Sequence, residues 1–399
     1  MLVGVVGKPN VGKSTFFKAA TLADVEIANY PFATIKPNQG VGFVKVKSAA
    51  KDFGKEPNPR EGYYLDGWRF VPITMIDVAG LVPGAHEGKG MGNQFLDDLR
   101  QADVLIHVID VSGGTNEKGE TVQSGSYDPA EDVQFLEVEL DMWYLNIIKK
   151  GWEKFARTVV QDKQDVHVAL GKQLSGLKVT EKMIESTLEE LGVNKSKPND
   201  WSERELMVLA TTLRKKTKPM VIACNKIDVP GAADNFSRLQ EKFKDYIFIS
   251  CSAEAELALR EAAKTGLIDY VPGNNKFSLR GNSQLNEKQQ RALDFIRKNI
   301  LDQFESTGVQ EVLDTAVFKL LGYMAIFPGG VSKLEDKDGN VLPDCFLMPP
   351  ASTALDFAYK LHTDLGKNFI RAIDVRTKRT VGKEHLLQNR DVVEIVAGR

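Results

Sequence analysis

The sequence predicts an α/β protein with a doubly wound, mostly parallel sheet, an inserted helical hairpin and a small C-terminal α+β domain of β-grasp type. Three observations lead to this prediction. Short apolar runs end in loops that contain glycine, aspartate or asparagine, as buried parallel strands do. Two of those loops are separated by about 90 residues more than the connecting strands and helices need. The last 75 residues change to short strand-like runs around one amphipathic helix.

Length and composition restrict the class of protein. The chain has 399 residues, which suits two or three domains, and 42% hydrophobic with 27% charged residues is typical of globular proteins. No run of about 18 apolar residues and no signal-peptide pattern occurs, so we expect a cytoplasmic protein without a membrane span. The net charge of −2 gives no overall attraction to nucleic acid. Cys224, Cys251 and Cys345 are expected to be free thiols.

The first strand-like run, Leu2 to Val6, leads directly into a glycine-rich motif. The motif and the residue after it read Gly7-Lys8-Pro9-Asn10-Val11-Gly12-Lys13-Ser14-Thr15. This matches G-x-x-x-x-G-K-[ST] between a strand and a helix, so its successive N–H groups are expected to bind phosphate oxygens. Lys13 can reach the β- and γ-phosphates, and Ser14 can ligate Mg²⁺. The alternative, a glycine-rich turn with a surface lysine, does not explain this placement.

Two further segments complete the predicted phosphate and magnesium site. Thr34 lies in a loop after the first helix, where it can complete the magnesium shell when a γ-phosphate is present. The strand-like run from Phe70 to Ile76 ends in Asp77, which suits a magnesium role through water. Gly80, three residues on, can present its N–H group to a γ-phosphate. The order of these segments along the chain favours this reading over isolated loop residues.

Residues 77–92, which read DVAGLVPGAHEGKGMG, resemble the Obg-like GTPases and their YchF branch in particular, as does the upstream NYPFAT loop. The resemblance extends to a strand that ends in Asn225-Lys226-Ile227-Asp228, the family's guanine-reading N-K-x-D, and to Ser252-Ala253, which would close over the base. Bacterial and eukaryotic YchF proteins typically depart from N-K-x-D and prefer ATP. Because this chain keeps the motif, the resemblance implies GTP and GDP as ligands, with an ATPase of the same fold as the alternative.

The surplus residues form the predicted insertion. Apolar residues from Val133 to Val159 recur at helical spacing with one step out of phase, which predicts a long helix with a coiled-coil-like seam. A second helix is expected around Ile184 to Leu191, and Ser202 with Glu205 forms a capping box for the helix after the insertion. The aromatic seam is expected to pack internally. The basic residues between Lys149 and Lys163 are read as a solvated helix face, with RNA contact as the alternative.

The C-terminal residues also carry a resemblance. Residues 350–366 closely resemble the TGS domain, and 351–399 hold nine basic and six acidic side chains, which is compatible with RNA contact. The predicted domains are therefore a P-loop G domain (1–124 and 201–320), the helical insertion (125–200) and a TGS domain (321–399). The predicted function is that of a slow, magnesium-dependent GTPase acting as a molecular switch with ribosome or RNA. A nucleotide-gated adaptor, in which hydrolysis is incidental, is the alternative.

Two residues bear on how hydrolysis would proceed. Many regulatory GTPases carry a glutamine directly after D-x-x-G, but Leu81 holds that position here and cannot orient water. His86, in the following glycine-rich segment, is the candidate catalytic residue beside Lys13 and Gly80, and a surface histidine is the alternative. Asn10 resembles the asparagine of potassium-activated relatives, so K⁺ is a candidate second cation; the alternative is an asparagine that shapes the turn.

Overall fold

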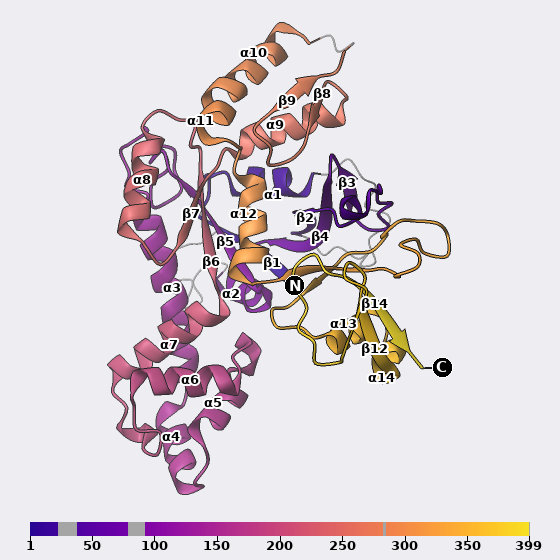
Figure 1. Cartoon of the computed structure of the whole chain (residues 1–399). Helices are drawn as coiled ribbons and strands as arrows, with labels where there is room; N and C mark the ends of the chain where they lie inside the picture. The colour runs from indigo at the N-terminus through magenta and orange to yellow at the C-terminus, as the bar shows by residue number, and fades with distance from the viewer. Residues whose placement is uncertain (23–37, 79–91, 282–284, 399) are drawn as a thin grey trace. The chain divides into compact units, whose positions relative to one another are not determined.

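A computed structural model describes residues 1–22, 38–78, 92–281 and 285–398, with α2 (Gly92–Gln101) described mainly as backbone (Figure 1). The chain divides into two compact units, which are considered one at a time. Unit 1 consists of Met1–Phe17 and Met75–Ala253, and unit 2 of Lys18–Thr74 and Glu254–Arg399. Each unit is thus assembled from two stretches of chain that are distant in sequence.

The centre of unit 1 is a parallel sheet. Its strands lie in the order β4-β1-β5-β6-β7. Their bounds are β1 (Leu2–Val6), the last residues of β4 (Trp68–Asp77), β5 (Val104–Asp110), β6 (Met220–Asn225) and β7 (Ile247–Ser250). β5 is parallel to β1 and β6, and every residue of β5 and β6 is buried, which explains their continuous apolar runs. Parallel strands end at one edge of the sheet, so the loops after β1, β5 and β6 meet there.

Helices make up the rest of unit 1. The insertion contains α3 (Ala130–Lys149), α4 (Trp152–Gln161), α5 (Val166–Leu174) and α6 (Glu181–Leu191), followed by α7 (Glu203–Thr217) and α8 (Ala232–Lys242). α3 packs along α7, where the buried Arg214 pairs with Asp141 at 2.7 Å. The predicted capping box of Ser202 and Glu205 is confirmed. α3 to α6 lie within the residues predicted as the insertion, whereas α7 and α8 follow them.

The insertion differs from the prediction in two respects. The helix expected to continue from Val133 to Val159 is interrupted after Lys149, and Gly151 adopts a left-handed backbone conformation with φ of 74° at the start of α4. Glycine adopts that conformation without a Cβ clash, so it can end one helix and begin another. The predicted single long helix is therefore wrong, and the phase step in the apolar pattern marks the break. The insertion is also larger than a two-helix hairpin.

Unit 2 begins with β2 (Gln39–Lys47), β3 (Tyr63–Leu65) and most of β4, in which β3 pairs antiparallel with β4. Its second stretch continues with α9 (Ala253–Lys264), the hairpin of β8 (Ile268–Tyr270) and β9 (Phe277–Leu279), α10 (Glu287–Ile296), α11 (Asp302–Phe304) and α12 (Val309–Asp314). Segments of π-helix follow α10 and α12. One apolar core joins α9, the β8-β9 hairpin and α10.

The end of unit 2 is a five-stranded sheet around one helix, as the sequence predicts. The strand order is β11-β10-β14-β12-β13. The bounds are β10 (Met324–Pro328), β11 (Phe346–Met348), α13 (Ala354–Leu361), α14 (Thr363–Lys367), β12 (Phe369–Asp374), β13 (Arg379–Val381) and β14 (Val392–Ala397). Thr353 and Asp356 form a capping box at the start of α13, and the fully buried Phe357 anchors that helix in the core.

Candidate nucleotide-binding site

The glycine-rich motif forms a tight loop between β1 and α1 (Lys13–Thr21). Asn10 and Gly12 have φ of 64° and 91°, and a Cβ on Gly12 would lie 2.2 Å from Nδ2 of Asn225. A Cβ on Gly7 would lie 2.5 Å from the carbonyl oxygen of Val108. Both glycines of the motif are therefore required by the space around them. A glycine-shaped loop at a helix N-terminus is the arrangement that binds phosphate through backbone N–H groups.

Lys13 and Asp77 come together beside this loop. They lie 64 positions apart in the chain, and the Lys13 ammonium group donates to Oδ1 of Asp77 in an ion pair. Ser14 is exposed next to Lys13 in the first turn of α1, and Thr15 is half-buried. The site thus combines a cation suited to phosphate, an exposed hydroxyl and a carboxylate. This donor set fits a magnesium–nucleotide complex in chemical type.

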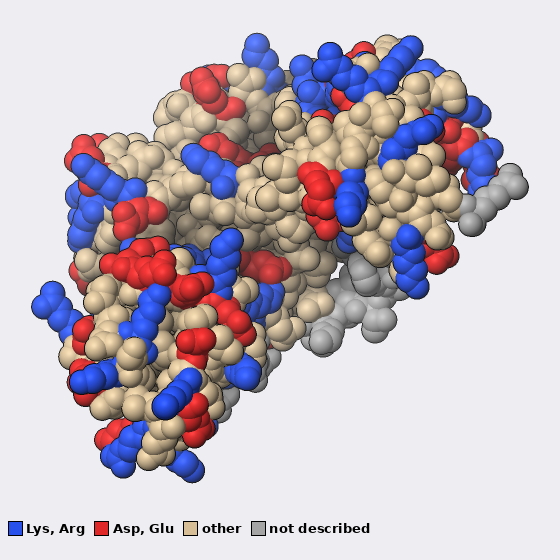
Figure 2. Space-filling model, turned by 60° about the horizontal axis from the view of Figure 1, so that its bottom comes forward, with Lys and Arg blue, Asp and Glu red and all other residues tan. Residues whose placement is uncertain are grey.

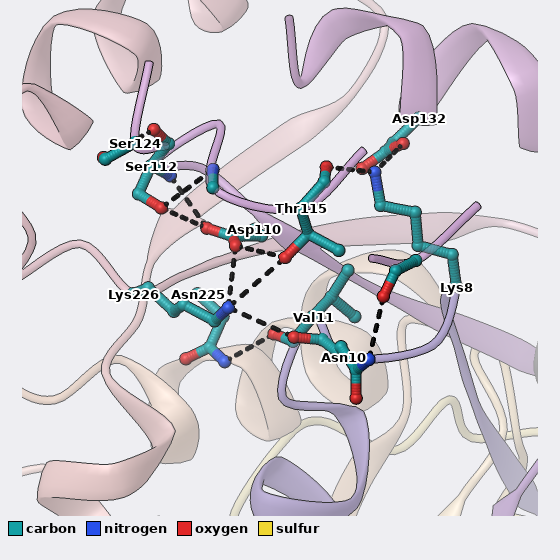
Figure 3. A network of polar contacts seen from close by, with 12 residues as sticks. Lys8, Asn10, Val11, Asp110, Ser112, Thr115, Ser124, Asp132, Asn225 and Lys226 are labelled. Carbon is teal, nitrogen blue, oxygen red and sulfur yellow. Dashed lines mark hydrogen bonds and ion pairs between the residues drawn. The ribbon is translucent and has the colours of Figure 1, made fainter. Parts of the chain in front are cut away.

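Asn225 connects three of the predicted motifs (Figure 3). Its side chain is 3% exposed at the end of β6, where Nδ2 donates to the carbonyl of Val11 at 2.8 Å. Its Oδ1 accepts from the backbone N–H of Ala253 at 3.0 Å. One amide side chain therefore holds the phosphate loop, the start of N-K-x-D and the Ser252-Ala253 segment in a fixed relation, because it uses its donor and its acceptor in opposite directions.

Lys226 makes a second link to the phosphate loop. Its backbone has φ of 63°, and Nζ donates to the carbonyl of Asn10 at 3.1 Å and to Oδ2 of Asp110 at 2.7 Å. Burial alone would raise the pKa of Asp110, but hydrogen bonds from Lys226, Ser112 and Thr115 hold it below its ordinary value. Asp110 thus stays ionised and fixes Lys226. Asp228 follows in half-buried surroundings, after a backbone bond from Ile227 to the carbonyl of Cys251.

The segment that follows β5 packs directly on the phosphate loop, a contact that no sequence motif predicts. Nδ2 of Asn10 donates to the carbonyl of Gly119 at 2.8 Å, and a Cβ on Gly119 would lie 2.8 Å from Cβ of Pro9. Lys8 is 5% exposed, and its Nζ donates to the carbonyl of Thr115 at 2.8 Å. Of the predicted cofactor-binding residues, Lys8 therefore turns its side chain into the protein, so only its backbone N–H remains available for phosphate.

Several predicted residues lie outside the part of the chain that the structure describes. These are Thr34, Gly80, Leu81 and His86. Their proposed roles stay predictions. Asn10 stays a predicted potassium ligand. Its side-chain nitrogen donates to the carbonyl of Gly119, so its side-chain oxygen is the atom that could bind a cation.

Other features of the chain bear on its class. All three cysteines are free thiols, and Cys224 and Cys251 are buried. Within residues 1–22, 38–78, 92–281 and 285–398, no helix is both long and apolar enough to cross a membrane, and no three His, Cys, Asp or Glu side chains gather as a metal cluster. Figure 2 shows Lys and Arg interspersed with Asp and Glu over the face in view. Neither sign of charge dominates that face.

Three family models match parts of this chain. The model of the 50S ribosome-binding GTPase family matches residues 2–138, which contain the phosphate loop and Asp77. The model described as the Obg-like GTPase YGR210-like, G4 motif-containing domain matches residues 223–330, and the TGS domain model matches residues 337–397. Together these matches support a P-loop GTPase fold with a C-terminal TGS domain.

Individual proteins are similar over almost the whole chain. An uncharacterized GTP-binding protein of Methanocaldococcus jannaschii is 48% identical over 397 residues, covering 99% of each chain. The crystal structure of a GTP-binding protein from Pyrococcus horikoshii OT3 is 41% identical, covers 100% of both chains and has a TM-score of 0.79. The ribosome-binding ATPase YchF of Bacillus subtilis is 26% identical, covering 98% of each chain. The chain therefore belongs to the Obg-like family of GTP-binding proteins that includes YchF.

Proposed function

We propose that the protein binds GTP and GDP with Mg²⁺ and hydrolyses GTP slowly as a molecular switch. The observation that carries this proposal is the side chain of Asn225, which joins the phosphate loop at Val11 to the N-K-x-D segment and to Ala253. A phosphate-binding element and a base-reading element held by one buried amide form a single nucleotide site. The family membership gives the same class of ligand.

The roles of individual residues follow from the chemistry of phosphoryl transfer. Mg²⁺, when bound, would supply positive charge that offsets the negative charge of the phosphate oxygens. Ser14 would hold the ion directly, with Thr34 joining in the triphosphate state, and Asp77 would act through water. Lys13 would exchange its bond to Asp77 for phosphate oxygens, and the backbone N–H groups of the phosphate loop would orient the phosphates. Gly80 would offer its N–H to the γ-phosphate.

The choice of base depends on Asp228. A carboxylate there can accept two N–H donors from guanine, whereas adenine does not offer that pair. Lys226, which precedes it by two residues, is fixed by Asn10 and Asp110, so the segment that carries Asp228 is anchored at its start. The alternative is ATP hydrolysis on the same fold, since the relatives named YchF are named as ATPases. The retained N-K-x-D favours guanine.

A ribosomal or RNA partner is proposed through the TGS domain and the insertion. The supporting observation is that a relative from Bacillus subtilis is named a ribosome-binding ATPase. The insertion itself is not a simple basic surface, because Lys149 pairs with Glu203 at 2.5 Å and Arg157 with Glu153 at 3.5 Å. Co-sedimentation with ribosomes, with and without a non-hydrolysable GTP analogue, separates a switch from an adaptor without nucleotide dependence.

Nucleotide titration of an Asp228 variant tests the proposed ligand. In the wild type, fluorescent GDP should bind far more tightly than fluorescent ADP. Asp228→Asn replaces one acceptor oxygen by a donor, so GDP affinity should fall at least tenfold while ADP affinity changes little. Asp234→Asn, which removes an exposed carboxylate six residues on in the first turn of α8, is the control and should bind both nucleotides as the wild type does. Equal affinity of the wild type for GDP and ADP would refute guanine specificity.

A further inference from the structure

The phosphate loop carries a second lysine, Lys8, whose side chain points away from the phosphate-binding side. Its Nζ lies 2.7 Å from Oδ1 of Asp132 (Figure 3). The same atom lies 3.9 Å from the centroid of the Tyr127 ring. It also donates to the carbonyl of Thr115, so two ligating oxygens and one aromatic face surround the ammonium group. Both charged side chains of the pair are 5% exposed. This buried ion pair has no part in the nucleotide contacts described above.

Asp132 lies in the first turn of α3, the helix that leads from the sheet into the insertion. The hydroxyl of Tyr127 donates to the same oxygen of Asp132 at 3.0 Å, while Oδ2 of Asp132 is buried without a partner. A buried carboxylate with one unsatisfied oxygen depends strongly on its cation. The position of the α3 N-terminus is therefore tied to the position of the Lys8 side chain.

The same region contacts the phosphate loop at neighbouring residues. Asn10 donates through Nδ2 to Gly119, and Lys226 donates both to the Asn10 carbonyl and to the hydroxyl of Thr115 at 3.4 Å. Residues 8 and 10 of the loop are thus bound to one continuous stretch of chain that runs from Ser112 to Asp132. At its far end, Asp128 accepts from the N–H of Ala130 at 2.9 Å, which connects the stretch directly to α3.

We propose that Lys8 is a positioning residue that couples the phosphate loop to the insertion through Asp132, so that a nucleotide on the loop changes the stability of the α3 N-terminus. This inference rests on the proposed function, since it concerns the same nucleotide site. Phosphate oxygens bind to the backbone of the loop, and a bound phosphate restricts that backbone. Restriction of residue 8 restricts the start of its side chain, and through Asp132 it restricts the first turn of α3. The effect is reciprocal: an event that displaces α3 changes nucleotide affinity by the same factor.

Amide hydrogen exchange of the full-length protein, with and without saturating GDP and Mg²⁺, measures this coupling. In the wild type, GDP should slow exchange in peptides that cover residues 112–149. Lys8→Met, which keeps the length of the side chain but removes its charge, should bind GDP with a three- to tenfold weaker affinity and lose that slowing in α3. The control is Lys178→Met. Lys178 also joins the insertion to another part of the unit, because it binds Asp103, which precedes β5, and the carbonyl of Gln101 at 2.8 Å. These residues are far in sequence from the phosphate loop, so the removal of this charge should leave the response unchanged.

A double-mutant cycle is completed by Asp132→Asn and by the double variant Lys8→Met/Asp132→Asn. The double variant leaves no unpaired buried charge, so it keeps the test valid even if Lys8→Met folds poorly. If the pair acts as a unit, the double variant should weaken GDP binding no more than either single variant does. Wild-type slowing of exchange in Lys8→Met, or a double variant whose effect is the product of the single effects, would overturn the proposal.

The two proposals fail in different ways. If ADP but not GDP binds the wild type and slows exchange in residues 112–149, guanine specificity is refuted while the coupling stands. If GDP binds and exchange in residues 112–149 does not change, the coupling is refuted while the proposed function stands. If neither nucleotide binds, both are refuted.

Discussion

Replacement of Asn225 by alanine should destabilise the protein even without a ligand. The Asn225 side chain is 3% exposed, donates to the carbonyl of Val11 at 2.8 Å and accepts from the N–H of Ala253 at 3.0 Å. Asn225→Ala leaves both of these backbone groups without their partner. An unsatisfied buried group costs about 1–3 kcal/mol, so the loss of both partners should lower the free energy of unfolding by about 2–6 kcal/mol. Nucleotide affinity should fall as well, because the phosphate loop loses its anchor.

Urea unfolding followed by circular dichroism gives the free energy of unfolding, and a fluorescent GDP titration gives the affinity. Asn199→Ala is the matched control in the same unit. Asn199 is exposed and donates only to its neighbour Asp200, so its replacement should change the stability by less than about 0.5 kcal/mol. A loss below about 1 kcal/mol for Asn225→Ala, equal to that of the control, would refute the bridging role of this side chain.

Two further predictions concern titration and turnover. Burial raises the pKa of Asp132 to about 6 against the opposing effect of Lys8, so the folded state holds this proton more tightly than the unfolded state, whose pKa is near 3.8. The contribution of this group to stability is therefore present at low pH and is lost as pH rises from about 4 to 6. The free energy of unfolding should fall over that range by at most about 1.4 kcal/mol per pH unit. Asp132→Asn should remove this pH dependence from urea-unfolding curves measured between pH 4 and 8, and an unchanged dependence would contradict the pKa shift. His86→Ala should lower GTP turnover about tenfold or more while GDP affinity stays intact, measured by phosphate release; unchanged turnover, alone and with ribosomes, would make His86 a structural residue.

Much of the fold could be predicted because its signals are local. The apolar runs that became β1, β5 and β6 are buried along almost their whole length, and such runs differ from amphipathic segments in the sequence itself. The predicted capping box at Ser202 likewise depends on a residue only three positions away, Glu205. The prediction of a single long insertion helix was wrong because the apolar spacing continues, one step out of phase, across the break at Gly151. The glycine was the available signal for that break.

The candidate site likewise combines features that the sequence predicts with features that it does not. The glycines of the phosphate loop are local requirements, and the space around Gly7 and Gly12 agrees with the motif. The partners of the loop are not local. Asp132 lies 124 positions from Lys8, and Asn225 lies 214 positions from Val11. No periodicity joins residues at such separations, so the sequence could predict that Asn225 belongs to a base-reading motif but not that its side chain contacts the phosphate loop.

The order of the strands decides which distant residues meet. β5 lies between β1 and β6, and all three run parallel, so the loops after these strands share one edge of the sheet. The phosphate loop follows β1, Asp110 ends β5, and Asn225 ends β6 with Lys226 directly after it. Because β5 is central, Asp110 is placed where Lys226 can bind it and the phosphate loop together, at 2.7 Å and 3.1 Å. The chain that leaves β5 must then pass beside the phosphate loop before it reaches α3. That topological position explains why the start of the insertion, rather than another helix, provides the carboxylate that pairs with Lys8.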